Sequence, residues 1–227
     1  MRLSNIGAAL RYVTGMDETN EQGLSSGPLV LAAHPNWRES RVNRRMLAAA
    51  RDVAQVRVHD LYARYADYDI DVPQEQALAR SASLIVLLHP IHWYAMPALL
   101  KLWVDEVLAY GWAYGPGGTA LQGKDLWLAA TTGGPESSYH PQGYNRYFFD
   151  AFLPPYEQTA ALCGMRFLPP MILHGAHRTS EEDIEQHVQV FKNRLATYPA
   201  WPELQEMDPC PACEVPGADR PDPILNT

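Results

Sequence analysis

Three short segments of the sequence place polar, aromatic or glycine residues directly after apolar runs. The first follows the run at residues 28–33 and contains His34, Ser40, Arg41 and Asn43. Ser40 can cap the following helix, whose first turn offers unpaired backbone N–H groups for an anion, and His34 and Arg41 can add positive charge. The patterns G-x-x-x-x-G-K-S/T and G-x-G-x-x-G are both absent, which favours a single phosphate over a triphosphate. An ordinary capped helix explains this segment equally well.

Flat side chains between two prolines form the second segment, after the apolar run at residues 83–89. Pro90 and Pro97 stiffen the backbone, and Trp93 and Tyr94 lie between them. A planar heterocycle requires such a rigid wall, with backbone N–H groups at its ring edge. Packing of both aromatic rings in the core is the alternative, but their position at a strand end favours a ligand.

Paired glycines form the third segment, Thr131-Thr132-Gly133-Gly134. Glycine lets the backbone approach a ligand without a Cβ atom in the way. A Gly-Gly pair alone usually marks only a turn. Because the carboxyl ends of parallel strands meet at one edge of a sheet, three such segments together are a more specific signal of one shared site.

The chain between these segments alternates between strand and helix patterns. Strands are expected at residues 28–33, 55–60, 83–89, 125–131 and 166–174, and helices at 41–53, 74–80, 97–109 and 180–197, with a further helix within 145–164 that Pro154-Pro155 breaks into two pieces. Such alternation implies right-handed crossovers. We therefore expect an α/β fold with a doubly wound, five-stranded parallel sheet and helices on both faces.

Size and composition predict one folded domain with two flanking segments. Of the 227 residues, 47% are hydrophobic, which suits one core. We expect residues 1–27 to be a flexible N-terminal extension, 28–198 the domain, and 199–227 an irregular, proline-rich C-terminal tail. The net charge of −8 argues against a nucleic-acid partner. The sequence shows no membrane-spanning run and no secretion signal, so we expect a cytoplasmic protein.

The cysteines and histidines do not predict a metal site. Cys210 and Cys213 have the spacing of a redox dithiol or of half a zinc site, but no second ligand pair lies nearby. Prolines around them oppose the helix start that would activate a thiol, so we interpret them as bystanders. Cys163 lies in an apolar stretch and is expected in the core. The eight histidines show no ligand spacing.

Taken in order, these motifs resemble the flavodoxin-like NAD(P)H:quinone oxidoreductase family. The likeness spans about residues 29–198 and rests on Ala33-His34-Pro35, Ser40-x-x-Asn43, Pro90-x-x-Trp93-Tyr94 and Thr131-Thr132-Gly133-Gly134. The stretch from Gly111 to Lys124, rich in glycine and aromatic residues, is similar to the branch that contains the ancillary oxidoreductase subunits of glutathione-gated potassium-efflux systems.

The resemblance implies a flavodoxin-like fold, one bound FMN, two-electron transfer from NADH or NADPH to a quinone, and a homodimer. The flavin phosphate would be held by His34, Ser40, Arg41, Val42 and Asn43. The flavin ring would be lined by Pro90, Ile91, His92, Trp93 and Tyr94, with Thr131, Thr132, Gly133 and Gly134 on its other side.

Tyr139 is the expected catalytic hydroxyl donor, because the family places a tyrosine over the flavin at about this position. The nearby histidine of the family is Asn145 here, which leaves His140, next to Tyr139, as a second candidate. A regulatory subunit that docks on a potassium-efflux membrane protein, with a sensory or structural flavin, is the alternative function. A one-electron carrier is disfavoured, because such carriers have a shorter phosphate loop.

Overall fold

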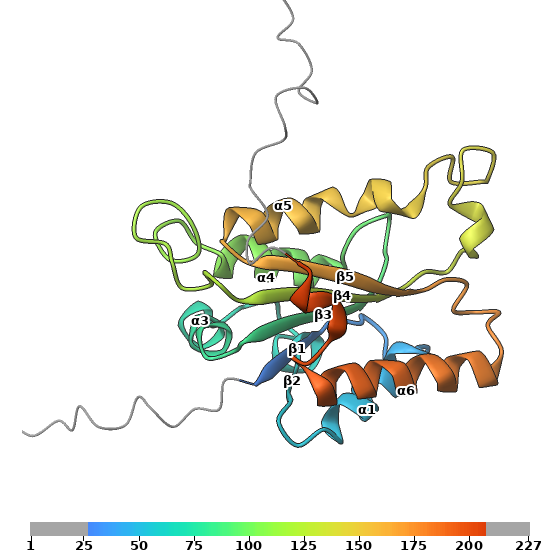
Figure 1. The fold of residues 1–227 in the computed structure, drawn as a ribbon, viewed down its shortest axis with the longest axis horizontal. Coiled ribbons are helices and arrows are strands. Elements are labelled where there is room, and N and C mark those ends of the chain that lie inside the picture. Colours follow the sequence, from blue (N-terminus) through green and yellow to red (C-terminus); the bar gives the residue numbers. More distant parts are fainter. Residues whose placement is uncertain (1–26, 208–227) are drawn as a thin grey trace, which may run out of the picture.

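The computed structural model describes residues 27–207, which contain a five-stranded, fully parallel sheet (Figure 1). The strand order is β2-β1-β3-β4-β5. This doubly wound order confirms the predicted flavodoxin-like fold, and it puts the topological switch point between β1 and β3. The strands are β1 (Pro28–Ala32), β2 (Arg57–Asp60), β3 (Leu84–Pro90), β4 (Asp125–Thr131) and β5 (Arg166–Leu173).

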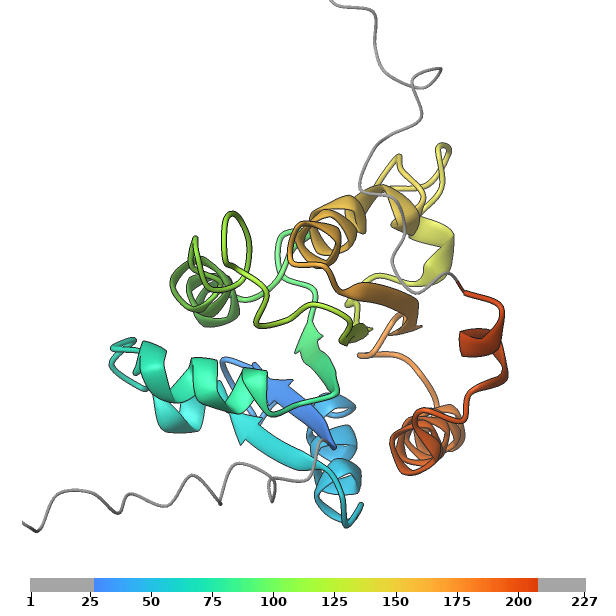
Figure 2. The ribbon, with the colours of Figure 1, turned by 60° about the vertical axis from the view of Figure 1, so that its left-hand side comes forward.

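Two helix layers cover the sheet (Figure 2). One face packs against α1 (Asn43–Arg51) and α6 (Glu181–Thr197). The other packs against α2 (Leu61–Arg64), α3 (Val72–Arg80), α4 (Ala98–Val107) and α5 (Pro154–Leu162). Successive strand residues point to opposite faces, so Leu29 and Leu31 belong to the second layer and Val30 to the first. Every residue of β1 and β4 is buried, as expected for parallel strands covered on both sides.

Several helix boundaries differ from the predicted ones, for local reasons. The first helix begins at Asn43 rather than at residue 41. The third begins at Val72, because Asp71 caps it by accepting a hydrogen bond from the backbone N–H of Gln74, 3.1 Å away. Pro154 begins α5. Proline is tolerated there because the N–H group that it lacks would have no partner in the first turn of a helix. The piece before it is a 3-10 turn, Phe149–Phe152, and the short helix α2 was not predicted.

Packing continues past residue 198, where the sequence placed the start of an irregular tail. Trp201 is 2% exposed, and its ring lies 4.9 Å from that of Trp127 in β4. Leu204 is also buried, within a 3-10 turn, Pro202–Gln205. The packed chain therefore reaches at least Leu204.

Cys163 lies in the core, as predicted. Cys210, Cys213 and the expected N-terminal extension lie outside the described residues. Between residues 27 and 207, no helix is long and apolar enough to cross a membrane. The same stretch holds no cluster of three or more histidine, cysteine or acidic side chains suited to a metal ion.

Candidate functional site

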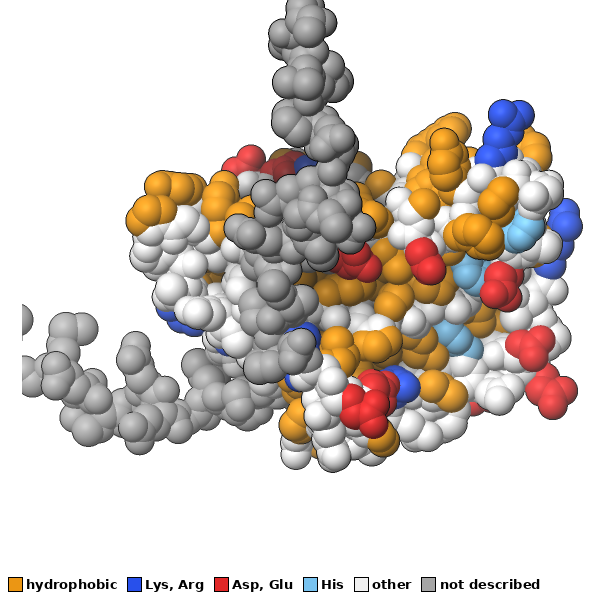
Figure 3. All heavy atoms as spheres, turned by 45° about the horizontal axis from the view of Figure 1, so that its top comes forward, with side chains coloured by type: hydrophobic (Ala, Val, Ile, Leu, Met, Phe, Trp, Pro, Cys, Tyr) orange, Lys and Arg blue, Asp and Glu red, His pale blue; other side chains and the backbone are white. Residues whose placement is uncertain are grey.

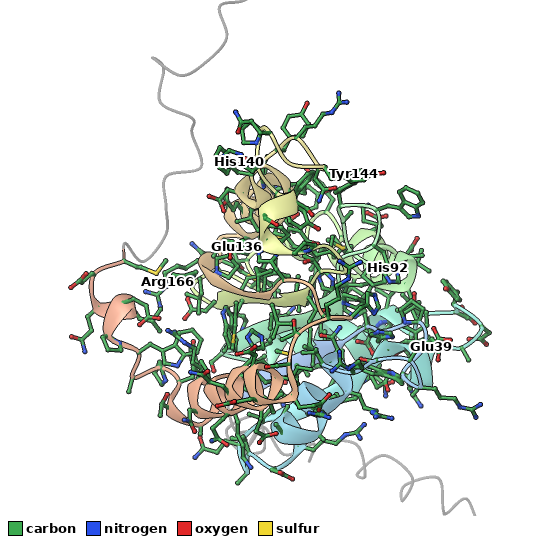
Figure 4. All side chains as sticks on the ribbon, turned by 90° about the vertical axis from the view of Figure 1, so that its right-hand side faces the viewer. Glu39, His92, Glu136, His140, Tyr144 and Arg166 are labelled. Carbon is green, nitrogen blue, oxygen red and sulfur yellow. The ribbon has the colours of Figure 1, made fainter. Side chains whose placement is uncertain are left out.

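The three predicted segments meet at the carboxyl edge of the sheet, which faces the viewer in Figure 4. Two adjoining cavities lie there and share Ile91. The first, of about 270 Å³, is named the polar cavity and is lined by residues from the segments 34–43, 90–92, 131–133 and 176–177. The second, of about 310 Å³, is named the aromatic cavity and is lined by Ile91, Trp93, Tyr94, Gly134, Ser138, Tyr139, Tyr144 and Asn145.

Two buried side chains, Ser40 and Asn43, form part of the polar cavity wall. Ser40 Oγ accepts a hydrogen bond of 3.0 Å from the backbone N–H of Arg44, in the first turn of α1. The N-cap position is Val42 rather than the predicted Ser40, and no side chain makes a capping bond from it. Asn43 Nδ2 donates to Thr131 Oγ1 at 3.1 Å. Asn43 Oδ1 is buried with no hydrogen-bond partner among the described residues. A buried acceptor without a partner is costly, so a ligand hydroxyl in this cavity would satisfy it.

His34 lines the polar cavity as a neutral donor rather than as the positive charge that the sequence suggested. Its Nδ1 atom accepts a 3.1 Å hydrogen bond from the backbone N–H of Asn36, so the ring proton belongs on Nε2. Burial, helped by nearby His92 and partly opposed by Asp60, lowers the pKa of His34 to about 4. At neutral pH the imidazole therefore offers an uncharged N–H group.

Arg41 does not offer a free positive charge either. Its guanidinium group donates to the backbone carbonyls of Ala176, His177 and Thr179 at 3.0–3.3 Å, and to the carboxylate of Glu181 at 2.6 Å. The three carbonyl bonds fix the loop after β5, which forms one side of the polar cavity, and the fourth bond ties Arg41 to the start of α6. The expected role of Arg41 at the phosphate therefore changes from a charge partner to a brace of the cavity wall. Val42 is buried, and it is the residue that precedes α1.

The second segment makes a tight turn at the aromatic cavity. His92 and Ala95 exchange backbone hydrogen bonds of 2.9 and 3.0 Å, with Trp93 and Tyr94 between them at φ values of 50° and 64°. Such turns normally have asparagine or glycine at both positions. Tyr94 is anchored because its ring stacks on Phe152 at 5.0 Å. Trp93 is 93% exposed. Of the two aromatic side chains predicted to line the ligand, only Tyr94 is therefore fixed by packing.

Three backbone hydrogen bonds join the loop after β4 to the loop after β5. Thr132 N donates to Leu173 O at 3.0 Å, Gly175 N to Gly134 O at 2.8 Å, and Ala176 N to Thr132 O at 2.9 Å. Gly175 has a φ of 68° and a Cβ atom there would contact Pro135, so glycine suits this turn. The pairing places the side chain of Thr132 beside that of His174.

Tyr139 lies at the aromatic cavity, as predicted, and His140 does not. Tyr139 is 8% exposed and packs edge-on against Phe149 and Phe152. Burial raises the pKa of Tyr139, while a hydrogen bond with Thr132 opposes that rise. The His140 ring is exposed, lies 5.1 Å from that of Phe148 and lines neither cavity. Figure 4 shows it apart from His92 and Tyr144. This geometry removes the support for a catalytic His140.

The loop after β5 contributes two site residues that the sequence did not predict. His177 lines the polar cavity, and His174 contacts the ring of Tyr139 at 5.2 Å. In the sequence, this loop is marked by Leu173-His174-Gly175, where polar and glycine residues follow an apolar run as they do in the three predicted segments. Tyr144 was not predicted either, and it lies 91% exposed at the rim of the aromatic cavity. It belongs to the segment 139–148, part of a lobe on which further hydrophobic side chains gather (Figure 3).

Comparison with known proteins agrees with this geometry. Residues 28–195 match the model of a family described as having a flavodoxin-like fold. The chain belongs to the flavodoxin-like fold family. It is 45% identical over 167 residues to the glutathione-regulated potassium-efflux system ancillary protein KefG of Erwinia tasmaniensis, which covers 74% of this chain and 91% of the relative. The relationship to the ancillary subunits that the sequence indicated is thereby confirmed.

Two solved structures are similar in fold and in sequence. General stress protein 14 of Treponema denticola, in complex with FMN, is 37% identical with a TM-score of 0.70, and the match covers 74% of this chain and 97% of that one. An NADPH-quinone reductase from P. pentosaceus is 27% identical with a TM-score of 0.68, covering 76% of this chain and 98% of that one.

Proposed function

We propose that this protein binds one FMN across the two cavities and uses it to pass two electrons from NADH or NADPH to a quinone-like acceptor. The observation that carries the proposal is the pair of adjoining cavities at the topological switch point of the sheet. One is lined by polar groups ahead of a helix start, and the other by aromatic rings. A flat molecule with one phosphate matches that division.

The polar cavity has the donors and the acceptor that the phosphate-bearing half of FMN requires. His34 offers its Nε2–H group, and the loop before α1 offers backbone N–H groups. The unpartnered Oδ1 atom of Asn43 can accept a hydrogen bond from a sugar-alcohol hydroxyl of the cofactor. Two charged side chains, Glu39 and the already engaged Arg41, also line this cavity. The phosphate would therefore be bound mainly through hydrogen bonds from neutral groups rather than through a free cation.

The aromatic cavity would hold the flavin ring and the acceptor. FMN, when bound, supplies the hydride chemistry. Tyr94 and Ile91 would contact the ring, and Tyr139 would serve the acceptor. Because burial raises its pKa, the Tyr139 phenol keeps its proton at neutral pH. Reduction of a quinone requires protons as well as electrons, so Tyr139 is suited to donate one to an acceptor oxygen.

The relatives support both the enzyme and a second function. An FMN complex and an NADPH-quinone reductase are among the similar structures. The similarity to the KefG ancillary protein favours, as a second function, docking of this protein on a potassium-efflux membrane protein at the inner face of the membrane. Both functions are compatible with a homodimer, for which the exposed aromatic side chains of Tyr144, Tyr147 and Phe148 offer a contact surface.

Flavin spectroscopy tests the enzyme directly. Protein purified with FMN should show the flavin absorption bands, lose them on anaerobic addition of NADH or NADPH, and regain them when a benzoquinone is added. We expect Asn43→Leu to lower FMN affinity at least tenfold, and Arg51→Gln, on the exposed side of α1, to leave it unchanged. A flavin that neither NADH nor NADPH reduces would contradict the proposed reaction.

Binding measurements test the second function. The flavin-loaded protein should bind the cytoplasmic domains of a potassium-efflux protein in calorimetry, and the flavin-free protein should bind them more weakly if the flavin is sensory. Equal affinities would make the flavin irrelevant to docking, and no measurable binding would contradict the docking function.

A further inference from the structure

Few of the side chains that line the polar cavity can carry a charge. Those that are charged or can titrate are Glu39, Arg41, His34, His92 and His177. Glu39, labelled in Figure 4, is exposed and acidic, and the guanidinium group of Arg41 is already ion-paired with Glu181 at 2.6 Å. A phosphate in this cavity would therefore meet one carboxylate and no uncommitted cation, and removing an unpaired anion from water is costly.

His34 does not supply the missing charge near neutral pH. Burial is the main reason that its pKa is lowered to about 4, and its Nδ1 atom already accepts a hydrogen bond from the backbone of Asn36. Among the lining residues this leaves the imidazoles of His92 and His177. Histidine is the side chain whose charge ordinarily changes between pH 5 and 8.

The ring of His177 lies directly beside Gly133. Its Cδ2 and Nε2 atoms are 3.5 Å from the position that a Cβ atom on Gly133 would occupy. Gly133 does not have a positive φ, so the conformation of its backbone does not require glycine. A side chain there would contact the imidazole, and its absence leaves Nε2 uncovered on that side.

Two hydrogen bonds fix the backbone that carries this ring. Arg41 Nη1 donates to His177 O at 3.0 Å, and the preceding residue, Ala176, donates through its N–H to Thr132 O at 2.9 Å. Arg41 belongs to the segment just before α1. Its bond therefore ties His177 to the helix start, where backbone N–H groups favour an anion.

The other two imidazoles of these loops have different surroundings. His92 directly follows Ile91, which lines both cavities, so it belongs to the junction between them. His174 is hydrogen-bonded through Nδ1 to Thr132 Oγ1 at 3.0 Å, contacts the ring of Tyr139 and does not line the polar cavity. His177 is therefore the imidazole suited to the phosphate end.

We propose that His177 takes up a proton when FMN binds and supplies the positive charge that the polar cavity otherwise lacks, so that the affinity for FMN rises as the pH falls from 8 to 6. The inference rests on the proposed function, in which this cavity holds the flavin phosphate. The proton comes from solution and adds to the imidazole, and no other covalent bond forms or breaks. The neutral donors still bind the phosphate, and His177 adds a charge to them.

The charged groups around His177 differ in their effect on this proton. Glu39, on the loop after β1, favours it. Arg41 opposes it, but Glu181 at the start of α6 offsets the charge of Arg41. Arg178, the next residue in the chain, is exposed, so solvent and salt screen its charge. The loop after β4 has no ionisable side chain between residues 131 and 135.

FMN binding measured against pH, with riboflavin as the matched ligand, tests this linkage. Flavin-free wild-type protein should bind FMN about fivefold more tightly at pH 6 than at pH 8, because a partly screened pair of charges shifts affinity by no more than about tenfold. Riboflavin has no phosphate and should show no such gain. Protonation of the phosphate itself reduces its charge in the same range, so it works in the opposite direction and does not produce the gain.

Calorimetry gives a second readout that does not depend on activity. Titrations at pH 7 in two buffers with different heats of ionisation should show net proton uptake on FMN binding and none on riboflavin binding. Absence of uptake with FMN would overturn the proposal.

Glutamine variants identify the residue that takes up the proton. His177→Gln keeps a neutral N–H donor of similar reach and should reduce the fivefold gain between pH 8 and pH 6 to less than about twofold. His140→Gln, at an exposed histidine that lines neither cavity, is the matched control and should keep the whole gain. Thermal unfolding shows that each variant is folded. If His177→Gln bound no FMN at either pH, the two-buffer calorimetry of the wild-type protein would decide instead.

The outcomes separate this inference from the proposed function. Wild-type protein that binds FMN at neither pH would contradict the proposed function. Wild-type protein that binds FMN equally well at both pH values would contradict this inference alone. The same holds if His92→Gln abolishes the gain and His177→Gln leaves it intact.

Discussion

The hydroxyl of Tyr94 donates a 3.2 Å hydrogen bond to Oδ1 of Asn145 across the aromatic cavity. The bond connects the turn after β3 to the loop that precedes the 3-10 turn Phe149–Phe152. Both residues line the cavity, and the two segments are otherwise 51 residues apart in the chain. The contact therefore fixes the width of the cavity where an acceptor would enter.

Removing that bond should affect acceptor binding more than folding. Tyr94→Phe keeps the ring stacked on Phe152 and loses only the hydroxyl, and Asn145→Ala removes the partner. Because an exposed hydrogen bond contributes about 1 kcal/mol, we expect the KM for quinone to rise about fivefold in each variant with Tm nearly unchanged. Steady-state kinetics of the double variant check the pairing. Effects that simply add would show that the bond does not act as a unit.

Trp93 should show a conflict between stability and function. A left-handed conformation costs a non-glycine residue about 1–2 kcal/mol, and this exposed ring gains little from packing. Trp93→Gly should therefore raise the free energy of unfolding, or leave it unchanged, while weakening FMN or acceptor binding. Urea denaturation and flavin titration measure the two effects. A loss of stability above about 1 kcal/mol would mean that the ring has structural contacts of its own.

Arg41 should matter through its geometry rather than its charge. Arg41→Lys keeps the charge, but its compact ammonium group cannot span the three carbonyls and the carboxylate that the planar guanidinium reaches, so we expect FMN affinity to fall about tenfold. Glu181→Gln is the matched control. It weakens only the exposed end of the network, where ion pairs contribute little, and it should change affinity less than twofold. If the two variants weakened FMN equally, the carboxylate pair rather than the bracing of the loop would hold the cavity wall.

His187 should make the protein less stable in acid. Burial lowers its folded-state pKa to about 4 from an ordinary 6.5, and its Nε2 atom is buried without a partner among the described residues. Between these two values the unfolded chain binds a proton that the folded chain does not. Stability therefore falls as the pH drops from 6.5 towards 4, and it is unaffected by this group above 6.5.

Replacing His187 with leucine tests that relation. His187→Leu should stabilise the protein by about 1 kcal/mol at pH 8, because it removes an unpartnered polar atom. The gain should grow by on the order of 1 kcal/mol at pH 5, after discounting for partial exposure. Urea unfolding at both pH values gives the difference. His34 and His89, whose pKa values are also lowered to about 4, keep part of the acid dependence in both proteins.

The sheet was predictable because apolar runs in parallel strands are long and uninterrupted. The runs that became β3 and β4 are buried on both sides, so their composition alone identified them. Boundaries were less accurate where one side chain decides them. Because Asp71 caps it, α3 begins at Val72, two residues before the predicted start. The helix α2 is a single turn, which is too short to show a helical period in the sequence. Trp201 falls within the predicted tail because the segment around it is rich in proline.

Apart from His140, the residues that the sequence predicted for the site lie at one edge of the sheet, but their individual roles were not readable from the sequence. Arg41 is engaged by carbonyls 135–138 positions away in the chain, and no local pattern reveals such a contact. The neutral state of His34 depends on burial and on His92, which the fold brings close. The role of His177 depends on the pairing of two loops that follow different strands.

The packing of Trp201 on Trp127 also limits how the chain can be shortened. A version that stops at residue 198 would leave the indole of Trp127 in β4 without the ring of Trp201 that packs edge-on against it. Recombinant versions intended for crystallography or for fusion to a partner should therefore end after Leu204. Versions that end earlier would expose the apolar surface of Trp127 to solvent, and we expect them to aggregate for a reason unrelated to the flavin site.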